Sequence, residues 1–466
     1  MLPETLFAPV GAAAIPLWLL READVAAFKA TQPPATASWL EHHGFVGERH
    51  RVVVLPDGGG GVAGAVAGVG ALADWSQLAW WQVAALIERL PAKDFEIVSP
   101  LPASALHQLL IGWLHAGYRL TRFKSSVSTS VRARVVPPTG VNVEALCRQG
   151  TALTLARDLI NAPANELGPA ELASVAADLA REFGAEYRCL EGDDLLANNY
   201  PLIHAVGRAS PRTPRLIDLR WGDPRHPTVT VVGKGVCFDS GGLDIKPSAG
   251  MALMKKDMGG AAVTLGLARS LMARGAPIRL RVLVPAVENS VSGGAYRPGD
   301  VVRSRRGLTV EIGNTDAEGR LILADALTEA DSERPDLLLD FSTLTGAARV
   351  ALGPELPAVF GNDAELVEQI RRCGDRELDP VWPMPLWDPY DEELGSRIAD
   401  LNNVASSAFA GAIFGALFLR RFVTATRSWA HFDLYAWNAR ERPGRPVGAE
   451  AQCLRLADRL IAERFE

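Results

Sequence analysis

Two stretches of the chain concentrate carboxylates, lysines and glycines. KGVCFDSGGLDIKPSAGMALMKKDMGG (234–260) carries Asp239 and Asp257, and NTDAEGR (314–320) carries Asp316 and Glu318. Four carboxylates close together in a partly buried cleft repel one another, and cations relieve that repulsion. Two divalent ions would match the four negative charges, and bridging carboxylates suit a two-metal centre. Neither stretch contains a histidine, so the pattern predicts oxygen ligands. A network of caps and salt bridges is the alternative.

Basic side chains in the same stretches extend this prediction. One of the lysines can supply a nitrogen ligand, because burial beside cations depresses the pKa of a lysine. Lys246 is suited to stabilise an oxygen that develops negative charge. Arg320 comes directly before a helix expected from about Leu321, whose first N–H groups attract an anion. We therefore expect Arg320 to hold a small oxyanion or a carboxylate, and Gly319 to let the chain turn before the helix.

Apolar runs predict the elements that bring these stretches together. TVTVVG (228–233) and LTVEIG (308–313) are expected to be strands that end directly before the two stretches. Further strands are predicted at 278–287 and 336–346, with a helix over 258–275. Continuous Val/Leu/Ile strands separated by helices indicate a parallel sheet covered on both faces. Such sheets bind ligands beyond the carboxyl ends of their strands.

The N-terminal part also alternates between strands and helices. Strands are predicted at 51–57 and 95–101, and helices over 72–90 and 104–120. This alternation favours a smaller α/β domain. The glycine-rich run 58–70 lacks the spacing of a dinucleotide-binding fingerprint, so we interpret it as a flexible or tightly packed turn.

The segment VVPPTG (135–140) is the strongest boundary signal. We predict an N-terminal α/β domain over 1–140, a linking helix over 141–163 and a catalytic domain over 164–466. The expected fold class is α/β. A smaller N-terminal domain precedes a larger domain with a central, mostly parallel sheet flanked by helices.

The composition of the chain indicates which binding partners and which cellular compartment to expect. The net charge of −6 over 466 residues gives no basic footprint for nucleic acid. Five scattered cysteines argue against a disulfide framework and favour a reducing cytoplasm. The apolar stretch LFAPVGAAAIPLWLL follows Glu4 and is interrupted by Pro9 and Pro16. It is a poor signal peptide and too short for a membrane span, so we expect an early strand and no membrane association.

Both acidic stretches closely resemble signature segments of the leucyl aminopeptidase family, the M17 cytosol aminopeptidases. The family's octapeptide NTDAEGRL is intact at 314–321. The supporting matches are NAPANELGP (161–169), YRPGD (296–300), STLTGA (342–347) and WAHFD (429–433). The resemblance covers at least 143–466 and implies a leucyl aminopeptidase-type metallo-exopeptidase of class EC 3.4.11.

The resemblance also implies roles for single residues. Lys234 and Asp257 would ligate one metal ion, and Asp239 and Glu318 would bridge both ions. Asp316 would complete the ligand set, with its backbone carbonyl also involved. The expected cofactors are two divalent ions per subunit, zinc or manganese, and the expected assembly is a homohexamer.

For catalysis, the resemblance implies that Lys246 polarises the scissile carbonyl and that Arg320 holds a bicarbonate ion acting as general base. The free α-amine of a peptide would bind at the metal centre, and a water or hydroxide held between the ions would attack the carbonyl. This arrangement would remove only the first residue of a peptide.

Three residues, Met254, Thr343 and Gly346, match positions of the family's first-residue pocket and imply an apolar, leucine-like preference. Tyr435 and Asn438 stand where family members more often have a small and an apolar residue, so the pocket is expected to be narrower. Cys237 replaces a more usual threonine beside Asp239, and we interpret it as a packing residue.

Three functions stay open. The first is a metal-dependent aminopeptidase for apolar N-terminal residues. The second is a dipeptidase of the same chemistry, for example of the Cys-Gly type, which the bulk of Tyr435 favours. The third is a non-catalytic hexameric binding scaffold, against which the intact set of seven site residues argues.

Overall fold

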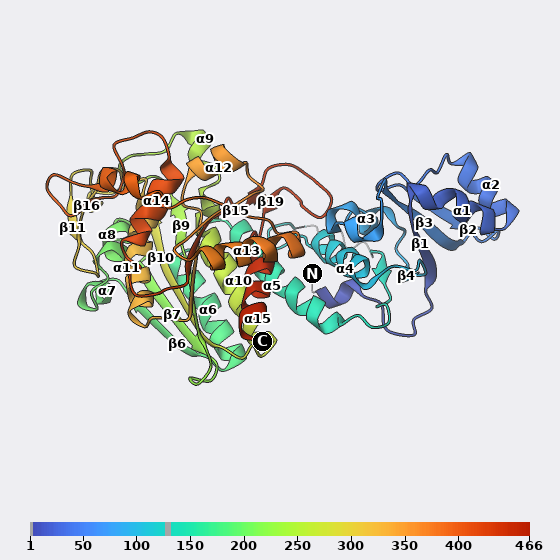
Figure 1. The fold of residues 1–466 in the computed structure, drawn as a ribbon, viewed down its shortest axis with the longest axis horizontal. Helices are drawn as coiled ribbons and strands as arrows, with labels where there is room; N and C mark the ends of the chain where they lie inside the picture. Colours follow the sequence, from blue (N-terminus) through green and yellow to red (C-terminus); the bar gives the residue numbers. More distant parts are fainter. Residues whose placement is uncertain (1–2, 126–131) are drawn as a thin grey trace. The chain divides into compact units, whose positions relative to one another are not determined.

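The computed structural model describes residues 3–125 and 132–466, which form two compact units (Figure 1). One unit runs to Thr151 and includes Ala439–Val447. The other comprises Ala152–Asn438 and Gly448–Glu466. Helix α5 (Val143–Asn161) contributes residues to both units. Among the residues described, no helix is both long enough and apolar enough to cross a membrane.

The first unit is built on a five-stranded sheet with the order β2-β3-β1-β4-β5. Strand β1 pairs in parallel with β3 and β4, and β2 pairs antiparallel with β3. The strands are β1 (Ile15–Arg21), β2 (Val52–Pro56), β3 (Val62–Gly70), β4 (Asp94–Ile97) and β5 (Arg134–Val135). The α-helices are α1 (Val25–Thr31), α2 (Pro34–His42), α3 (Leu86–Arg89) and α4 (Ala103–Gly117). The predicted N-terminal α/β fold is confirmed.

The turn predicted over the glycine-rich run 58–70 is wrong for most of its length. Only 58–61 turns, held by backbone N–H groups that donate to the Asp57 carboxylate. The rest is strand β3, which lies between β1 and β2. Its glycines serve close packing, since a Cβ on Gly64 would lie 2.8 Å from the Trp18 ring.

The single helix predicted over 72–90 is also wrong. The segment forms two 3-10 helices, Trp75–Gln77 and Trp80–Gln82, before the short helix α3. The Trp80 ring stacks on His115 of α4, with centroids 4.2 Å apart. Stacking and burial of this large side chain favour the irregular backbone over a continuous helix.

The second unit contains a nine-stranded sheet with the order β15-β14-β17-β13-β8-β10-β7-β6, and β9 pairs with β10. The central strands β17, β13, β8 and β10 run parallel. Strands β7, β6 and β14 join antiparallel neighbours. The strands are β6 (Glu186–Glu191), β7 (Arg215–Trp221), β8 (Thr228–Gly233), β9 (Gly235–Asp239), β10 (Arg279–Asn289), β13 (Leu337–Ser342), β14 (Ala358–Gly361), β15 (Trp382–Pro383) and β17 (Trp429–Asp433). The mostly parallel sheet is confirmed.

Helices cover both faces of this sheet (Figure 1). Successive residues of β13 alternate between two cores: Leu337 and Leu339 pack with one set of helices, and Leu338 packs with the other. The first set is α5, α6 (Pro169–Phe183), α10 (Gly259–Ala273), α13 (Ala364–Glu377) and α15 (Leu454–Phe465). The second set is α8 (Pro201–Gly207), α11 (Glu318–Ser332) and α14 (Gly411–Arg420). Burial on both faces explains the continuous apolar strands.

The strand predicted at 308–313 does not belong to the central sheet. It forms β12, which pairs antiparallel with β11 and parallel with β16 in a separate three-stranded sheet. These strands are β11 (Val301–Arg303), β12 (Thr309–Glu311) and β16 (Leu401–Asn402). NTDAEGR therefore leaves a peripheral sheet. Side chains from other segments hold the backbone of this stretch in place. The Asn403 side chain accepts the Gly313 N–H at 2.7 Å, and the Asp244 carboxylate accepts the Thr315 N–H at 2.7 Å.

The remaining elements of the second unit are short. They are α7 (Asp194–Ala197), α9 (Ser248–Met251), α12 (Gly346–Leu352), β18 (Trp437–Asn438) and β19 (Gly448–Ala449).

Candidate metal centre and substrate cavity

The first acidic stretch starts where β8 ends. Lys234 lies between β8 and β9, and its N–H donates to the Phe341 carbonyl of β13 at 2.9 Å. Asp239 ends β9. A 3-10 helix, Met254–Met258, then leads into α10 and carries Asp257. The side chains of Lys234, Asp239 and Asp257 are all buried, because each residue lies at the end of a central strand or directly before a helix that packs on the sheet.

The second stretch reaches the site through the turn before α11. Asn289 of β10 donates to the Thr315 carbonyl at 3.0 Å, and the Tyr296 hydroxyl donates to the same oxygen at 2.6 Å. Asp316 lies in this turn, and Glu318 is the first residue of α11. The helix thus begins three residues before the predicted start.

Arg320 consequently lies in the first turn of α11 rather than before the helix. Its Nη1 donates to the Asn403 carbonyl at 2.7 Å, and its Nε is buried without a partner among the described residues. Burial lowers the pKa of Arg320 to about 10. The side chain therefore keeps an unsatisfied donor, although Arg320 is not among the residues that line the cavity.

The expected role of Gly319 is corrected as well. This residue lies inside α11, and its φ is not in the left-handed region. A Cβ at this position would lie 2.6 Å from Cε and 2.7 Å from Nζ of Lys234. Gly319 thus makes room for the lysine and does not serve a turn.

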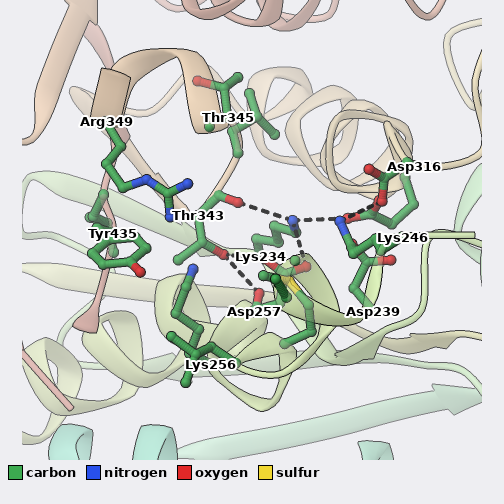
Figure 2. Close-up of a pocket in the computed structure, with 18 of the residues that line it drawn as sticks. Lys234, Asp239, Lys246, Lys256, Asp257, Asp316, Thr343, Thr345, Arg349 and Tyr435 are labelled. Carbon is green, nitrogen blue, oxygen red and sulfur yellow. Dashed lines mark hydrogen bonds and ion pairs between the residues drawn. The ribbon is translucent and has the colours of Figure 1, made fainter. Parts of the chain in front are cut away.

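The five predicted metal ligands come together in two linked ion-pair clusters (Figure 2). Lys234 Nζ lies 2.8 Å from Asp257 Oδ2 and 2.9 Å from Glu318 Oε1. Lys246 Nζ lies 2.8 Å from Asp239 Oδ2 and also contacts Asp316. Single oxygens of Asp239, Asp316 and Glu318 all lie within 4.8 Å of one another.

The electrostatics of this cluster show an excess of negative charge. Burial raises the pKa of Glu318 to about 8, and the neighbouring Asp239 carboxylate adds to this shift. Burial likewise raises the pKa of Asp239 to about 6, with a contribution from Asp257. Burial alone would lower the pKa of Lys234, but the carboxylates of Asp257 and Glu318 outweigh it and raise that pKa. Lys234 is therefore an ammonium in this arrangement and must release a proton to act as a ligand.

These residues fit divalent cations. Glu318 Oε2 is buried and has no hydrogen-bond partner among the described residues. A buried carboxylate oxygen without a partner is costly. An oxygen-rich donor set with one lysine nitrogen accepts several divalent metals, and cations would relieve the repulsion that raises the pKa of Glu318 and Asp239.

A cavity of about 350 Å³ opens beside the acids. All four predicted pocket residues line it: Met254, Thr343, Gly346 and Tyr435. The Thr343 hydroxyl donates to Asp257 Oδ1 at 2.7 Å, which ties the cavity wall to the acidic cluster. Leu253, Leu344 and Leu434 add apolar wall. Asn438, in contrast, is buried in β18 and is not one of the lining residues.

Sequence reasoning missed two cations at the other end of this cavity. Lys256 Nζ lies 4.7 Å from the centroid of the Tyr435 ring, and Arg349 Cζ lies 4.6 Å from the same centroid. Figure 2 shows these three side chains on the side of the cavity opposite Lys246 and Asp316. We call Lys256, Arg349 and Tyr435 the cationic end.

Only a weak signal in the sequence points to Lys256. It is the second lysine of the pair that precedes Asp257, and the sequence does not reveal which one turns inward. Lys255 donates to the Asn161 carbonyl at 2.6 Å and is partly exposed. Lys256 is only 4 % exposed. Burial lowers the pKa of Lys256 to about 8, although the Asp257 carboxylate opposes that shift.

Buried polar side chains behind the cavity fix its wall. The Asp433 carboxylate accepts the N–H groups of Leu344 and Thr345 at 2.9 and 3.1 Å. In the same sheet, His431 Nδ1 lies 2.5 Å from Asp340 Oδ1. Burial alone would lower the pKa of His431, but the Asp340 carboxylate outweighs it and raises that pKa.

Cys237 lies in the hydrophobic core and is 1 % exposed. Its Sγ lies 3.7 Å from the Gly235 carbonyl, and burial raises the pKa of its thiol well above the ordinary value. A buried, protonated thiol is unreactive, which supports a packing role.

Comparison with known proteins places the chain among the M17 peptidases. The catalytic domain of the cytosol aminopeptidase family matches residues 154–456, and the M17 aminopeptidase N-terminal domain matches residues 15–138. The chain belongs to the cytosol aminopeptidase family. The predicted enzyme class, an aminopeptidase of EC 3.4.11, is confirmed.

Individual relatives agree with this family. A probable cytosol aminopeptidase from Geobacter sp. (strain M21) is 45% identical over 318 residues, which cover 67% of this chain and 64% of that protein. The crystal structure of a cytosol aminopeptidase from Coxiella burnetii is 42% identical, with a TM-score of 0.93 and coverage of 98% of this chain and 99% of that one. The bottromycin maturation enzyme BotP in complex with Mn is 32% identical, with a TM-score of 0.87 and coverage of 98% and 100%. The family and the Mn complex support divalent metal cofactors.

Proposed function

We propose that the protein is a metal-dependent aminopeptidase that hydrolyses the N-terminal residue from peptides. The observation that carries this proposal is a cluster of four carboxylates, in which Asp239, Asp257 and Glu318 are buried and Asp316 is exposed, paired with Lys234 and Lys246 beside a cavity of about 350 Å³. Two divalent ions are the proposed cofactors, zinc or manganese. When bound, they supply Lewis-acid activation of the peptide carbonyl and an activated water nucleophile.

The chain's own residues divide the remaining tasks. We propose that Lys234 and Asp257 hold one ion and that Asp239 and Glu318 are shared between both, with Asp316 completing the set. The two shared carboxylates have raised pKa values, by burial and by neighbouring carboxylates, so they bind protons tightly until cations replace them.

Lys246 is the proposed electrophile. Its ammonium lies between Asp239 and Asp316. It also lines the cavity. Burial alone would lower its pKa, but the Asp239 carboxylate and its neighbours raise that pKa. A lysine that stays protonated can donate to the oxygen that becomes negative as the carbonyl is attacked.

Arg320 is proposed to hold a bicarbonate ion that acts as general base. The support is its buried, unpartnered Nε at the start of α11, where N–H groups also favour an anion. The free α-amine of the substrate is proposed to anchor at the acidic cluster, which would restrict cleavage to the first peptide bond.

We further propose a homohexamer in the cytoplasm, without nucleic-acid or membrane partners. The relatives' name supports the location. Light scattering coupled to gel filtration tests the assembly, because a hexamer has six times the 49.9 kDa mass of the chain.

A dipeptidase of the same chemistry is the second candidate, since the bulky Tyr435 side chain lines the cavity. Comparing a dipeptide with longer peptides that share its first residue separates the two candidates. An aminopeptidase cleaves both lengths, and a dipeptidase cleaves only the shorter one. A non-catalytic scaffold would cleave neither.

The activity is tested with a panel of aminoacyl and dipeptide substrates after chelation and after adding back each divalent metal. The expected result is hydrolysis of free-amine substrates that is lost on chelation and restored by zinc or manganese. No hydrolysis of any free-amine substrate with any metal would overturn the proposal.

A further inference from the structure

Lys256 is a buried cation that the proposed reaction does not use. It is 4 % exposed, and its side chain lines the cavity. In the described part of the chain, its ammonium contacts the Tyr435 ring but no hydrogen-bond acceptor or carboxylate. An ammonium has three donors, and burial without an acceptor is costly. The geometry therefore leaves donors free to bind a ligand in the cavity.

Nearby carboxylates are already engaged elsewhere. Asp257 directs one oxygen to Lys234 at 2.8 Å and the other to the Thr343 hydroxyl at 2.7 Å. Asp433 accepts two backbone N–H groups and the Thr345 hydroxyl, which is 2.6 Å away. Among the described residues, neither carboxylate forms a hydrogen bond or an ion pair with the Lys256 ammonium, although both attract it electrostatically.

Arg349 brings a second cation to the same place. Its guanidinium lies over the same Tyr435 ring, and within the described ranges it has no carboxylate partner. Figure 2 shows Arg349 and Lys256 approaching the tyrosine from two different elements. Two cations that lie over one tyrosine ring, with no carboxylate in contact with either among the described residues, repel one another, and an anion between them would be stabilised by both.

We propose that the cationic end (Lys256, Arg349 and Tyr435) binds the side-chain carboxylate of an N-terminal glutamate or aspartate, making the enzyme selective for acidic first residues. This inference rests on the proposed function, and it replaces the leucine-like preference predicted from Met254, Thr343 and Gly346. Those residues and their leucine neighbours pack the methylene part of the side chain. Asp239 and Asp316 lie farther from the cationic end, on the side of Lys246 (Figure 2), and the α-amine is proposed to bind there.

Electrostatics favour an acidic side chain over leucine here. Leucine would cover the buried Lys256 ammonium without supplying an acceptor, which is unfavourable. A lysine substrate would add a third cation. Glutamine has nearly the shape of glutamate but no charge. Comparing substrates that begin with these two residues therefore isolates the effect of the charge on selectivity. Charge-assisted hydrogen bonds exceed neutral ones enough to predict a preference for glutamate on the order of 10- to 100-fold.

A carboxylate could also come from the C-terminus of a short peptide. Aminoacyl p-nitroanilides lack that carboxylate, so they report on the side chain only. A matched pair, Leu-Gly and Leu-Gly-amide, reports on the C-terminus only.

The experiment measures kcat/KM of the metal-loaded full chain for the p-nitroanilides of glutamate, glutamine and leucine, and for the matched pair. It compares wild type with Lys256→Met, Arg349→Met and the control Lys255→Met. Lys255 is the adjacent lysine, and it does not line the cavity. Isothermal titration calorimetry of free L-glutamate against free L-glutamine gives a second readout that needs no turnover.

The expected result is a glutamate-over-glutamine ratio on the order of 10 or more in wild type, falling toward 1 in Lys256→Met, reduced in Arg349→Met and retained in Lys255→Met. Arg349 is exposed on α12, so its replacement is expected to leave the fold intact. The Arg349→Met variant therefore tests the inference if Lys256→Met does not fold. Equal kcat/KM values of wild type for the glutamate and glutamine p-nitroanilides would overturn the inference. An unchanged preference for glutamate in both Lys256→Met and Arg349→Met would also overturn it. So would an effect confined to Leu-Gly over Leu-Gly-amide. Hydrolysis of no substrate refutes the proposed function instead, and the calorimetric ratio then still decides this inference.

Discussion

Replacing Gly319 with alanine is expected to impair the metal centre while leaving the fold intact. The new methyl carbon would lie 2.6 Å from Lys234 Cε, 2.7 Å from Nζ and 2.9 Å from Cδ. Ordinary contact begins at 3.4 Å, so the lysine end must move by at least 3.4 − 2.6 = 0.8 Å. Its ammonium then leaves the positions 2.8 and 2.9 Å from Asp257 and Glu318.

The consequence for activity is large, because a displacement of about 1 Å at a reacting centre lowers rates by about 100-fold. The consequence for stability is small. The atoms in contact belong to the end of a flexible side chain. Alanine also favours a helix interior over glycine by about 1 kcal/mol, which offsets part of the lost ion pairing. We expect kcat/KM to fall by about 100-fold and the free energy of unfolding to change by less than about 2 kcal/mol.

The assay combines kcat/KM on a free-amine substrate, bound metal per chain and urea unfolding, for wild type and Gly319→Ala. Gly293→Ala is the matched control, because a Cβ at that exposed loop position meets nothing within 4 Å. The control should behave as wild type in all three measurements. Wild-type activity and metal content in Gly319→Ala would refute the reasoning that this glycine exists to accommodate Lys234.

Three further predictions follow from the site. Asp316→Asn and Glu318→Gln should each abolish metal binding and activity with the fold retained by circular dichroism, and full activity in either variant would contradict the ligand assignment. Lys246→Met should lower kcat by about 100-fold with bound metal retained, because it removes one donor to the developing oxyanion; an unchanged kcat would exclude that role. The pKa of His431 is raised above 6.5 by Asp340 despite burial, so their pair stabilises the fold below that pH and loses this contribution as pH rises through the folded-state pKa. The stability difference between wild type and Asp340→Asn in urea should therefore shrink from about pH 6 to about pH 9, and a constant difference would contradict the pairing.

The central strands could be predicted from sequence because burial on both faces leaves a local signature. The runs 228–233 and 278–287 are continuously apolar and form β8 and β10. The sequence does not reveal that the strand at 308–313 lies outside the central sheet, since its partner β16 lies far along the chain. The segment 72–90 was misjudged for a similar reason, because Trp80 is fixed by stacking on α4.

The acidic cluster could be predicted because its residues lie in two short, dense stretches. The cationic end could not. Which lysine of the pair before Asp257 turns inward depends on Tyr435, which comes from a distant part of the chain. Arg349 follows the recognised segment STLTGA without belonging to it. The neighbours of Gly319 in the sequence indicate a turn, but the constraint at this position is contact with the Lys234 side chain, which comes from a distant part of the chain.

The most direct test of the central claim is a metal titration of the chelator-treated full chain. Release of the first residue is followed from a free-amine peptide and from its N-acetylated counterpart, together with the number of ions bound. The account predicts that cleavage of the free-amine peptide appears with added zinc or manganese and reaches its maximum at two ions per chain, while the N-acetylated peptide is not cleaved. Cleavage by the metal-free protein, equal cleavage of both peptides, or no cleavage of either with any metal would contradict it.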